Sequence, residues 1–165
     1  MSNPVKLRKV LTLEEAKALR EQLRREGKVV VFANGIFDVL HGGHVSYLAE
    51  ARAMGDALFV GVNTDASERA LKGLGRPIYP EQERLEILDA IRYVDALVLF
   101  DEHTCENLLR ELRPDIHVKG TDYTVETVPE REVARELGIE TRIAGPPKEN
   151  ASRGVIATII ERYGG

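Results

Sequence analysis

Tryptophan is absent from this sequence of 165 residues, aromatic residues make up 5% of it, and there is one cysteine, Cys105. So few aromatic rings argue against a base-stacking surface for single-stranded nucleic acid. The net charge of −4 also argues against broad nucleic-acid binding, because such binding needs a basic face. A single cysteine excludes an internal disulfide and a metal cage built of thiolates. Cys105 is therefore interpreted as a small core or surface residue, with a catalytic thiol as the alternative.

Long apolar runs are missing too. No stretch approaches the roughly 18 residues of a membrane span, and the first residues lack the apolar core of a signal peptide. We therefore expect a cytoplasmic protein that does not bind membranes. Internal repeats and linker-like stretches are absent, and the length is that of one domain. The sequence predicts a single domain over residues 1–165, in which residues 1–27 form an N-terminal helical extension.

Apolar runs alternate with segments of helical periodicity along the chain. The strands are continuously apolar, which is typical of a parallel sheet covered by helices on both faces. Thr12 and Thr104 are predicted helix N-caps, and Gly27 is a predicted helix stop. In such an α/β fold, ligands bind beyond the carboxyl ends of the strands, where the strand order reverses. The predicted strands are 28–33, 57–62, 96–100, 116–119 and 140–143, and the predicted helices are 12–26, 44–54, 66–71, 81–91, 105–113, 129–137 and 152–162.

The segment after the first predicted strand, residues 34–44, is rich in glycine and histidine. His41 and His44 are about one helical turn apart, so both imidazoles can face the same point. Gly35 and Gly43 allow the backbone to approach a ligand closely. The helix that begins here presents free N–H groups and the positive end of its dipole. Together these features predict an anion site, and phosphate is the natural anion.

Neither common phosphate-binding loop is present, since the sequence contains no G-x-x-x-x-G-K-[ST] and no G-x-G-x-x-G. Histidines in place of a P-loop lysine suit transfer at the α-phosphate of a nucleotide, with pyrophosphate as the leaving group. Such a reaction needs positioning and electrostatic stabilisation more than a covalent nucleophile. Two alternatives stay open for His41 and His44: a zinc site with a third ligand from elsewhere, and a purely structural glycine turn. His103 and His117 are interpreted as surface or core residues.

The run G-I-F-D-V-L-H-G-G-H at 35–44 resembles the G-x-F-D-x-x-H-x-G-H signature of the cytidylyltransferase-like nucleotidyltransferases. The resemblance extends over about residues 12–163. Within that superfamily the chain is most similar to the adenylyltransferase domain of ADP-heptose synthesis, which acts on a heptose 1-phosphate. The resemblance implies a Rossmann-like, doubly wound, five-stranded parallel sheet in the order 3-2-1-4-5, with three α/β/α layers. It also implies a homodimer and Mg²⁺ that is bound through the nucleotide and not by protein side chains. The supporting segments are F-A-N-G-I-F-D at 32–38, H-V-S-Y-L-A-E-A-R at 44–52, G-V-N-T-D-A-S at 61–67, L-K-G at 71–73, R-P-I at 76–78 and V-K-G-T-D-Y at 118–123.

Site roles follow from matching positions in the family. Arg84 could add a charge to the site, although an arginine on a helix surface is the simpler interpretation. Lys72 could equally be an exposed lysine at a helix end, and Asn63 and Asp65 could equally cap the next helix. The resemblance implies catalytic roles for His41, His44 and Lys72. It implies nucleotide or phosphate binding by Gly35, Ile36, Phe37, Gly43, Lys119, Gly120, Ser152 and Arg153. It implies acceptor binding by Asp38, Asn63, Asp65, Asp122 and Tyr123.

Three features depart from the heptose pattern. Ser152-Arg153-Gly154 stands where the family usually has Ser-Thr-Thr, Thr121 stands where the heptose enzymes tend to have glycine, and residues 91–95 resemble a segment of glycerol-3-phosphate cytidylyltransferases. The predicted activity is transfer of AMP from ATP to a sugar 1-phosphate, with release of pyrophosphate. The alternatives are a glycerol-3-phosphate cytidylyltransferase, an FAD synthetase, a non-catalytic nucleotide-binding protein and a zinc-dependent hydrolase.

Overall fold

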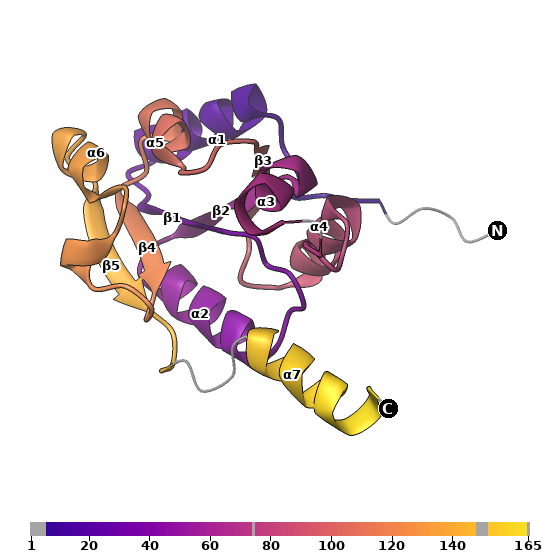
Figure 1. Cartoon of the computed structure of the whole chain (residues 1–165). Helices are drawn as coiled ribbons and strands as arrows, with labels where there is room; N and C mark the ends of the chain where they lie inside the picture. The colour runs from indigo at the N-terminus through magenta and orange to yellow at the C-terminus, as the bar shows by residue number, and fades with distance from the viewer. Residues whose placement is uncertain (1–5, 74, 148–151, 165) are drawn as a thin grey trace.

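The computed structural model describes residues 6–73, 75–147 and 152–164. Its centre is a sheet of parallel strands, β1 to β5, in the order β3-β2-β1-β4-β5 (Figure 1). The chain steps from β1 outward to β2 and β3, and then returns to the other side of β1 for β4 and β5. The predicted strand order is confirmed, and the order reverses between β1 and β4. The strands are β1 Val30–Gly35, β2 Ala57–Asn63, β3 Ala96–Phe100, β4 Ile116–Gly120 and β5 Glu140–Ala144.

Helices cover both faces of the sheet, so the predicted three layers are confirmed. On one face, α1, α5 and α6 pack over a core that includes Phe32, Phe59 and Leu109. On the other face, α2 and α4 pack over a core that includes Leu48 and Leu58. The helices are α1 Leu13–Arg25, α2 Gly42–Ala53, α3 Asp65–Lys72, α4 Glu81–Ala90, α5 Glu106–Leu112, α6 Arg131–Glu136 and α7 Ser152–Tyr163, with a short 3-10 helix, η1, at Val125–Thr127.

The first helix begins and ends as its sequence predicts. The Thr12 hydroxyl accepts a hydrogen bond from the Glu15 N–H, and the Glu15 carboxylate accepts one from the Thr12 N–H, which is a capping box. Gly27 adopts a φ of 70°, which ends the helix. The Lys28 N–H still donates to the Leu23 carbonyl at 2.9 Å. Because Lys28 completes the helix end, β1 begins at Val30 and not at the predicted residue 28.

One predicted cap is wrong. The cap position of α5 is Cys105 and not Thr104, and Cys105 makes no capping hydrogen bond with its side chain. The thiol is instead fully buried, and the Cys105 N–H donates to the Glu130 carboxylate at 3.4 Å. Packing of this side chain therefore sets the start of the helix, which a rule based on hydroxyl caps does not capture.

Residues 9–11 lie beside β3. The Leu97 N–H donates to the Lys9 carbonyl at 2.8 Å, and the Leu11 N–H donates to the Leu97 carbonyl at 2.9 Å. This short segment covers the edge strand, where unpaired backbone groups would otherwise face solvent. The prediction of a single domain with residues 1–27 as an extension stays a prediction. Among the described residues, every helix is too short or too polar to cross a membrane.

Candidate active site

The two histidines of the glycine-rich segment cap α2 together. His41 is the N-cap residue, and its Nδ1 accepts a hydrogen bond from the Gly43 N–H at 3.1 Å. The His41 N–H donates in turn to Nδ1 of His44 at 3.3 Å. The ring centroids lie 4.2 Å apart. Since a neutral imidazole whose Nδ1 accepts a hydrogen bond carries its proton on Nε2, this arrangement assigns an Nε2–H donor to each ring.

The loop between β1 and α2 has an unusual backbone. Phe37 and Val39 have φ values of 56° and 49°, in the left-handed region that side chains other than glycine rarely adopt. The Phe37 side chain is buried, and its ring centroid lies 6.0 Å from that of His44. Strained residues of this kind persist where packing holds them, and they are concentrated at functional sites. Packing of Phe37 thus fixes the loop against the histidine pair.

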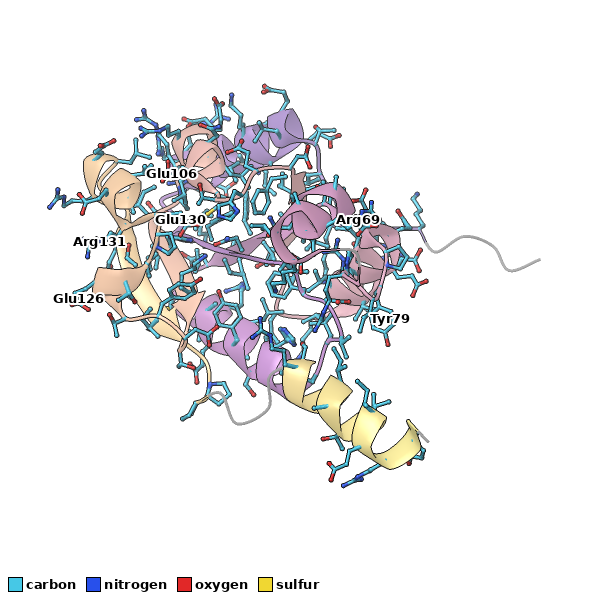
Figure 2. The ribbon with its side chains drawn as sticks, viewed as in Figure 1. Arg69, Tyr79, Glu106, Glu126, Glu130 and Arg131 are labelled. Carbon is cyan, nitrogen blue, oxygen red and sulfur yellow. The ribbon has the colours of Figure 1, made fainter. Side chains whose placement is uncertain are left out.

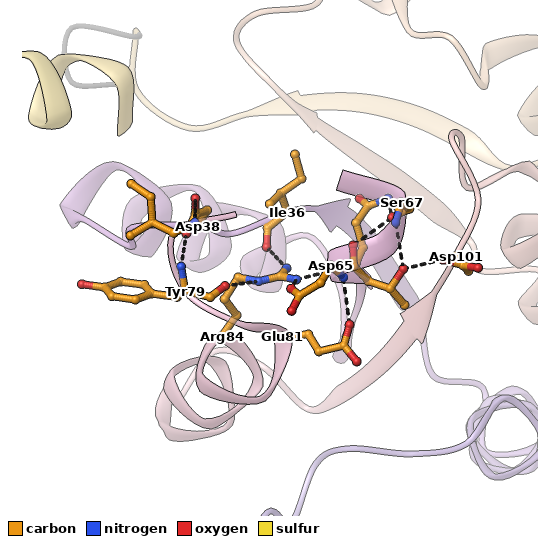
Figure 3. Close-up of polar contacts among 11 residues, drawn as sticks. Ile36, Asp38, Asp65, Ser67, Tyr79, Glu81, Arg84 and Asp101 are labelled. Atoms are coloured by element: carbon orange, nitrogen blue, oxygen red, sulfur yellow. Dashed lines mark hydrogen bonds and ion pairs between the residues drawn. The ribbon is translucent and has the colours of Figure 1, made fainter. Parts of the chain in front are cut away.

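Asp38 holds a second loop in place and is almost fully buried. Its carboxylate accepts hydrogen bonds from the Tyr79 N–H at 3.0 Å (Figure 3), from the Ile78 N–H at 2.8 Å and from the Arg76 guanidinium at 3.2 Å. Burial alone would raise the pKa of Asp38, but these three donors lower the pKa below its usual value. The structure therefore uses both oxygens to fasten residues 76–79 beside the histidine loop.

Arg84 is buried, although the simpler interpretation of the sequence placed it on a helix surface. An arginine on the helix surface was one interpretation, yet Arg84 is 0% exposed and lies on the inward face of α4. That interpretation is wrong, because α4 turns this position towards the sheet and the loops. The guanidinium donates to the carbonyls of Ile36 at 2.5 Å, Asn63 at 2.8 Å and Tyr79 at 3.1 Å, and to the Asp65 carboxylate at 2.8 Å (Figure 3). Arg84 thus ties the ends of β1 and β2 to the loop before α4.

The predicted residues at the end of β2, Asn63 and Asp65, belong to the set of contacts around Arg84. Asp65 pairs with Arg84, and the Asn63 amide donates to the Ser67 hydroxyl at 3.3 Å and the Glu102 carbonyl at 3.2 Å. The cap of α3 is Thr64, so neither Asn63 nor Asp65 caps that helix with its side chain. Their predicted contact with the acceptor stays a prediction.

Lys72 and α7 approach the site differently. Lys72, at the end of α3, forms an ion pair with the buried Glu68 at 3.4 Å. Its predicted catalytic role stays a prediction.

Ser152, the first residue of α7, donates to the Asp38 carbonyl at 2.9 Å. The N-terminus of α7 is therefore held at the histidine loop, as a phosphate-binding role requires. Arg153 is exposed.

Lys119 is drawn into the molecule at the end of β4. It is 8% exposed, and its ammonium lies 3.5 Å from the Glu130 carboxylate and 3.3 Å from the Asn34 amide oxygen. The ammonium also lies 5.3 Å from the ring centre of Tyr123, within range of a cation–π contact. Gly120 is the last residue of β4, and Asp122 lies in the turn that follows. Lys119 and Tyr123 are thus brought together at the carboxyl edge of the sheet.

The structure gathers most of the predicted residues at one edge of the sheet. The histidine loop follows β1, Ser152 begins α7, and Lys119 lies near the end of β4, on the side where the strand order reverses. Sequence reasoning missed Arg76, Asn34 and Glu130. Asn34 could have been found, because it is a polar residue at the end of a buried strand. Nothing near Glu130 in the sequence points to the site.

The zinc alternative for His41 and His44 finds no support in the described residues. One group of three residues there offers metal-ligating atoms close together, and it consists of Cys105, His117 and Glu130. The geometry instead combines two imidazole donors with a helix N-terminus, which is suited to phosphate. The fold is of the doubly wound α/β class, and its candidate phosphate site lies where the strand order reverses, which is where proteins of this class bind their ligands.

Comparison with known proteins identifies the family. Residues 32–158 match the family described as cytidylyltransferase-like, and the chain belongs to this family. The chain is 45% identical over 155 residues to the bifunctional protein HldE of Syntrophotalea carbinolica, which covers 94% of this chain and 32% of that protein. It is 44% identical over 155 residues to the bifunctional protein HldE of Pseudomonas aeruginosa strain LESB58, covering 94% and 33%. The chain thus spans about a third of the length of these curated relatives.

A solved structure agrees with this assignment. The lipopolysaccharide core biosynthesis protein from Thermoplasma volcanium superposes with a TM-score of 0.59 and is 35% identical, covering 71% of this chain and 94% of that one. The resemblance inferred from the histidine motif is therefore confirmed at the level of the family.

Buried His117 predicts a pH dependence of stability. Burial, together with Lys119 nearby, lowers its pKa from 6.5 to about 4. Between these values the unfolded chain binds a proton that the native chain does not, so stability falls as the pH falls. The expected slope is about 1.4 kcal/mol per pH unit at most. Urea unfolding near pH 7 and about pH 4.5 should show this loss, and His117→Leu should flatten it. An equal loss in both proteins would contradict the assignment.

Proposed function

We propose that this chain transfers AMP from ATP to the phosphate of a sugar 1-phosphate, specifically a heptose 1-phosphate, and releases pyrophosphate. The observation that carries the proposal is the histidine pair, whose two Nε2–H donors are fixed by the mutual cap at the start of α2. The likeness to HldE proteins and to a lipopolysaccharide core biosynthesis protein supports the choice of a sugar phosphate.

The proposed reaction is an in-line displacement at phosphorus. An oxygen of the acceptor phosphate attacks the α-phosphorus of ATP, the new P–O bond forms, and the bond to the pyrophosphate oxygen breaks. The electron pair of the broken bond leaves with pyrophosphate. A general base is unnecessary, because a sugar phosphate is already ionised near neutral pH. His41 and His44 stabilise the charge that develops on the phosphoryl oxygens.

The surrounding residues supply position. Backbone N–H groups near Ile36 and Phe37 would hold phosphate oxygens. Gly35 and Gly43 would let the phosphates come close to the backbone, although the Gly43 N–H itself donates to Nδ1 of His41. Ser152 and Arg153 at the start of α7, and Lys119 and Gly120 at the end of β4, would complete the nucleotide site. Lys72 would reach the phosphates from α3 after leaving Glu68. The acceptor site would be lined by Asp122 and Tyr123. Its other predicted residues are Asp38, Asn63 and Asp65, which hold the neighbouring loops in position.

Magnesium fits this site through the nucleotide. Oδ2 of Asp38 accepts from Arg76 and Ile78 and Oδ1 accepts from Tyr79, so this carboxylate is used to hold residues 76–79. The ion would therefore be held by phosphate oxygens and water, as Mg²⁺ commonly is. When bound, it neutralises charge on the triphosphate. We further propose, on the family resemblance, a cytoplasmic homodimer.

A pyrophosphate-release assay tests the proposal. ATP, CTP, GTP and UTP are each combined with heptose 1-phosphates, glycerol 3-phosphate and FMN in the presence of Mg²⁺. Release with ATP and a heptose 1-phosphate is the expected result. Release only with CTP and glycerol 3-phosphate would contradict the proposed substrates. It would instead favour a glycerol-3-phosphate cytidylyltransferase, an enzyme with a segment that residues 91–95 resemble. Binding of ATP without release for any acceptor would favour a non-catalytic nucleotide-binding protein.

A further inference from the structure

A polar cluster is buried beside the proposed site, between β4 and the segment before α6. Cys105, His117 and Glu130 are each at most 2% exposed, and Glu130 lies inside the molecule (Figure 2). The Cys105 sulfur lies 3.7 Å from Nε2 of His117 and 3.5 Å from a Glu130 oxygen. These distances would suit the edges of a tetrahedral zinc site. The cluster therefore needs an explanation, either as a metal site or as a hydrogen-bond network.

A cation is already present in this cluster. The Lys119 ammonium lies 3.5 Å from Glu130, so its charge balances the carboxylate without a metal ion. The Cys105 thiol donates to the other Glu130 oxygen, and burial together with Glu130 raises the pKa of that thiol well above its usual value. A protonated thiol is a hydrogen-bond donor and a poor metal ligand. The contacts therefore describe a set of hydrogen bonds joined to an ion pair between Lys119 and Glu130.

Asn34 of β1 is held by this network. Its amide oxygen lies 3.0 Å from Nε2 of His117, which is placed to donate, and it accepts a second hydrogen bond from Lys119 at 3.3 Å. Burial lowers the pKa of His117 to about 4, so the ring is neutral near pH 7 and has one N–H to give. Because His117 and Lys119 both donate to Oδ1, the orientation of the Asn34 amide is fixed. The NH₂ group must then point away from His117 and Lys119.

Asn34 lies at the edge of the sheet where ligands of this fold class bind. Asn34 immediately precedes Gly35 and the histidine loop, and Ala33 of β1 pairs with Val118 of β4. Asn34 and Lys119 thus stand side by side on the two strands between which the strand order reverses. The turned amide can supply a donor at the crevice where ligands of this fold class bind.

We propose that Asn34 is a substrate-binding residue, whose NH₂ group donates to a hydroxyl or phosphate oxygen of the bound nucleotide or sugar phosphate. His117, Lys119 and Glu130 are positioning residues that hold the amide in this orientation. The inference rests on the proposed function for the identity of the substrates. It adds a binding contact that the histidine motif does not include.

The substitution Asn34→Asp tests the donor. Aspartate keeps an oxygen that accepts from His117 and Lys119, but it replaces the NH₂ group with a second, negatively charged oxygen. The melting temperature should stay near that of the wild type, and kcat/KM should fall roughly 10- to 100-fold, the range for a lost hydrogen bond to a charged or polar ligand. The KM that rises, for ATP or for the sugar phosphate, identifies the ligand. Unchanged kcat/KM for both substrates would overturn the proposal.

A second variant tests the positioning role. His117→Leu removes the N–H that turns the amide, so the same KM should rise, and the double variant with Asn34→Asp should lose less than the product of the two single effects. Glu130→Gln, which removes the charge that holds Lys119, should raise the same KM. The exposed Glu132→Gln is its matched control and should leave both KM values unchanged. Fully multiplicative losses would mean that His117 acts on stability alone and would overturn the positioning role.

Two further measurements separate this inference from its rivals. Calorimetric binding of ATP and of the sugar phosphate, without turnover, should be weaker for Asn34→Asp even if AMP transfer is never observed. Failure of the proposed function is thereby distinguished from failure of this inference. Stoichiometric zinc in the purified wild type that is lost in Cys105→Ser would overturn the proposal, because Nε2 of His117 would then bind metal and could not donate to Asn34.

Discussion

Replacing His44 with alanine is expected to lower kcat about 100-fold or more, the scale of losing one preorganised donor to a developing oxyanion. In the proposed reaction the ring donates its Nε2–H to the phosphoryl group. Its Nδ1 accepts the His41 N–H at 3.3 Å, so the substitution also releases His41. Steady-state pyrophosphate release under saturating ATP and acceptor measures the effect.

Two variants distinguish chemistry from helix capping. His44→Asn retains an acceptor that can bond the His41 N–H, but it lacks the ring donor, so it should be nearly as slow as His44→Ala. The exposed His103→Ala removes an imidazole away from the site and should turn over normally. A His44→Ala enzyme that works close to the wild-type rate would contradict the assignment of the histidine pair.

Arg84→Met should produce the largest loss of stability, about 3–5 kcal/mol. The guanidinium is 0% exposed and donates to three carbonyls and the Asp65 carboxylate, so its removal takes this partner away from a partly buried anion and from three carbonyl acceptors. Because these bonds join the ends of β1 and β2 to the loop before α4, activity should fall well below the level that the folded fraction explains. Urea unfolding and pyrophosphate release on the same samples measure both effects.

Arg92→Met is the matched control for this prediction. Arg92 lies just after α4, is partly exposed and donates to the neighbouring Tyr93 hydroxyl. Its replacement should change the free energy of unfolding by less than about 0.5 kcal/mol. Equal stability losses in the two variants would show that the buried arginine network contributes nothing of its own.

The parts of the fold that depend on local sequence could be predicted. The capping box at Thr12, the stop at Gly27 and the continuously apolar strands each lie within a few residues of the feature that they specify. The histidine motif could be found for the same reason, because the cap between His41 and His44 spans a single helical turn. The strand order came from the family resemblance and not from the pattern.

The rest depends on contacts between distant parts of the chain. Arg84 reaches Ile36 across 48 positions, and Lys119 reaches Asn34 across 85. The neighbours of Arg84 in the sequence, Glu83 and Leu85, do not by themselves show that α4 turns its side chain inward. Thr104 was predicted as a cap from its hydroxyl, while the burial of Cys105 sets the helix start. Burial and long-range pairing are properties of the packed chain, which local patterns do not contain.

The fate of the α-phosphate tests the central claim most directly. With ATP labelled at the α-phosphorus and a heptose 1-phosphate in the presence of Mg²⁺, the label should appear in a nucleoside-diphosphate sugar, while label at the γ-phosphorus should appear only in pyrophosphate. Recovery of the γ-label on the sugar, or of the α-label as free AMP without a sugar product, would contradict transfer of AMP to the acceptor phosphate.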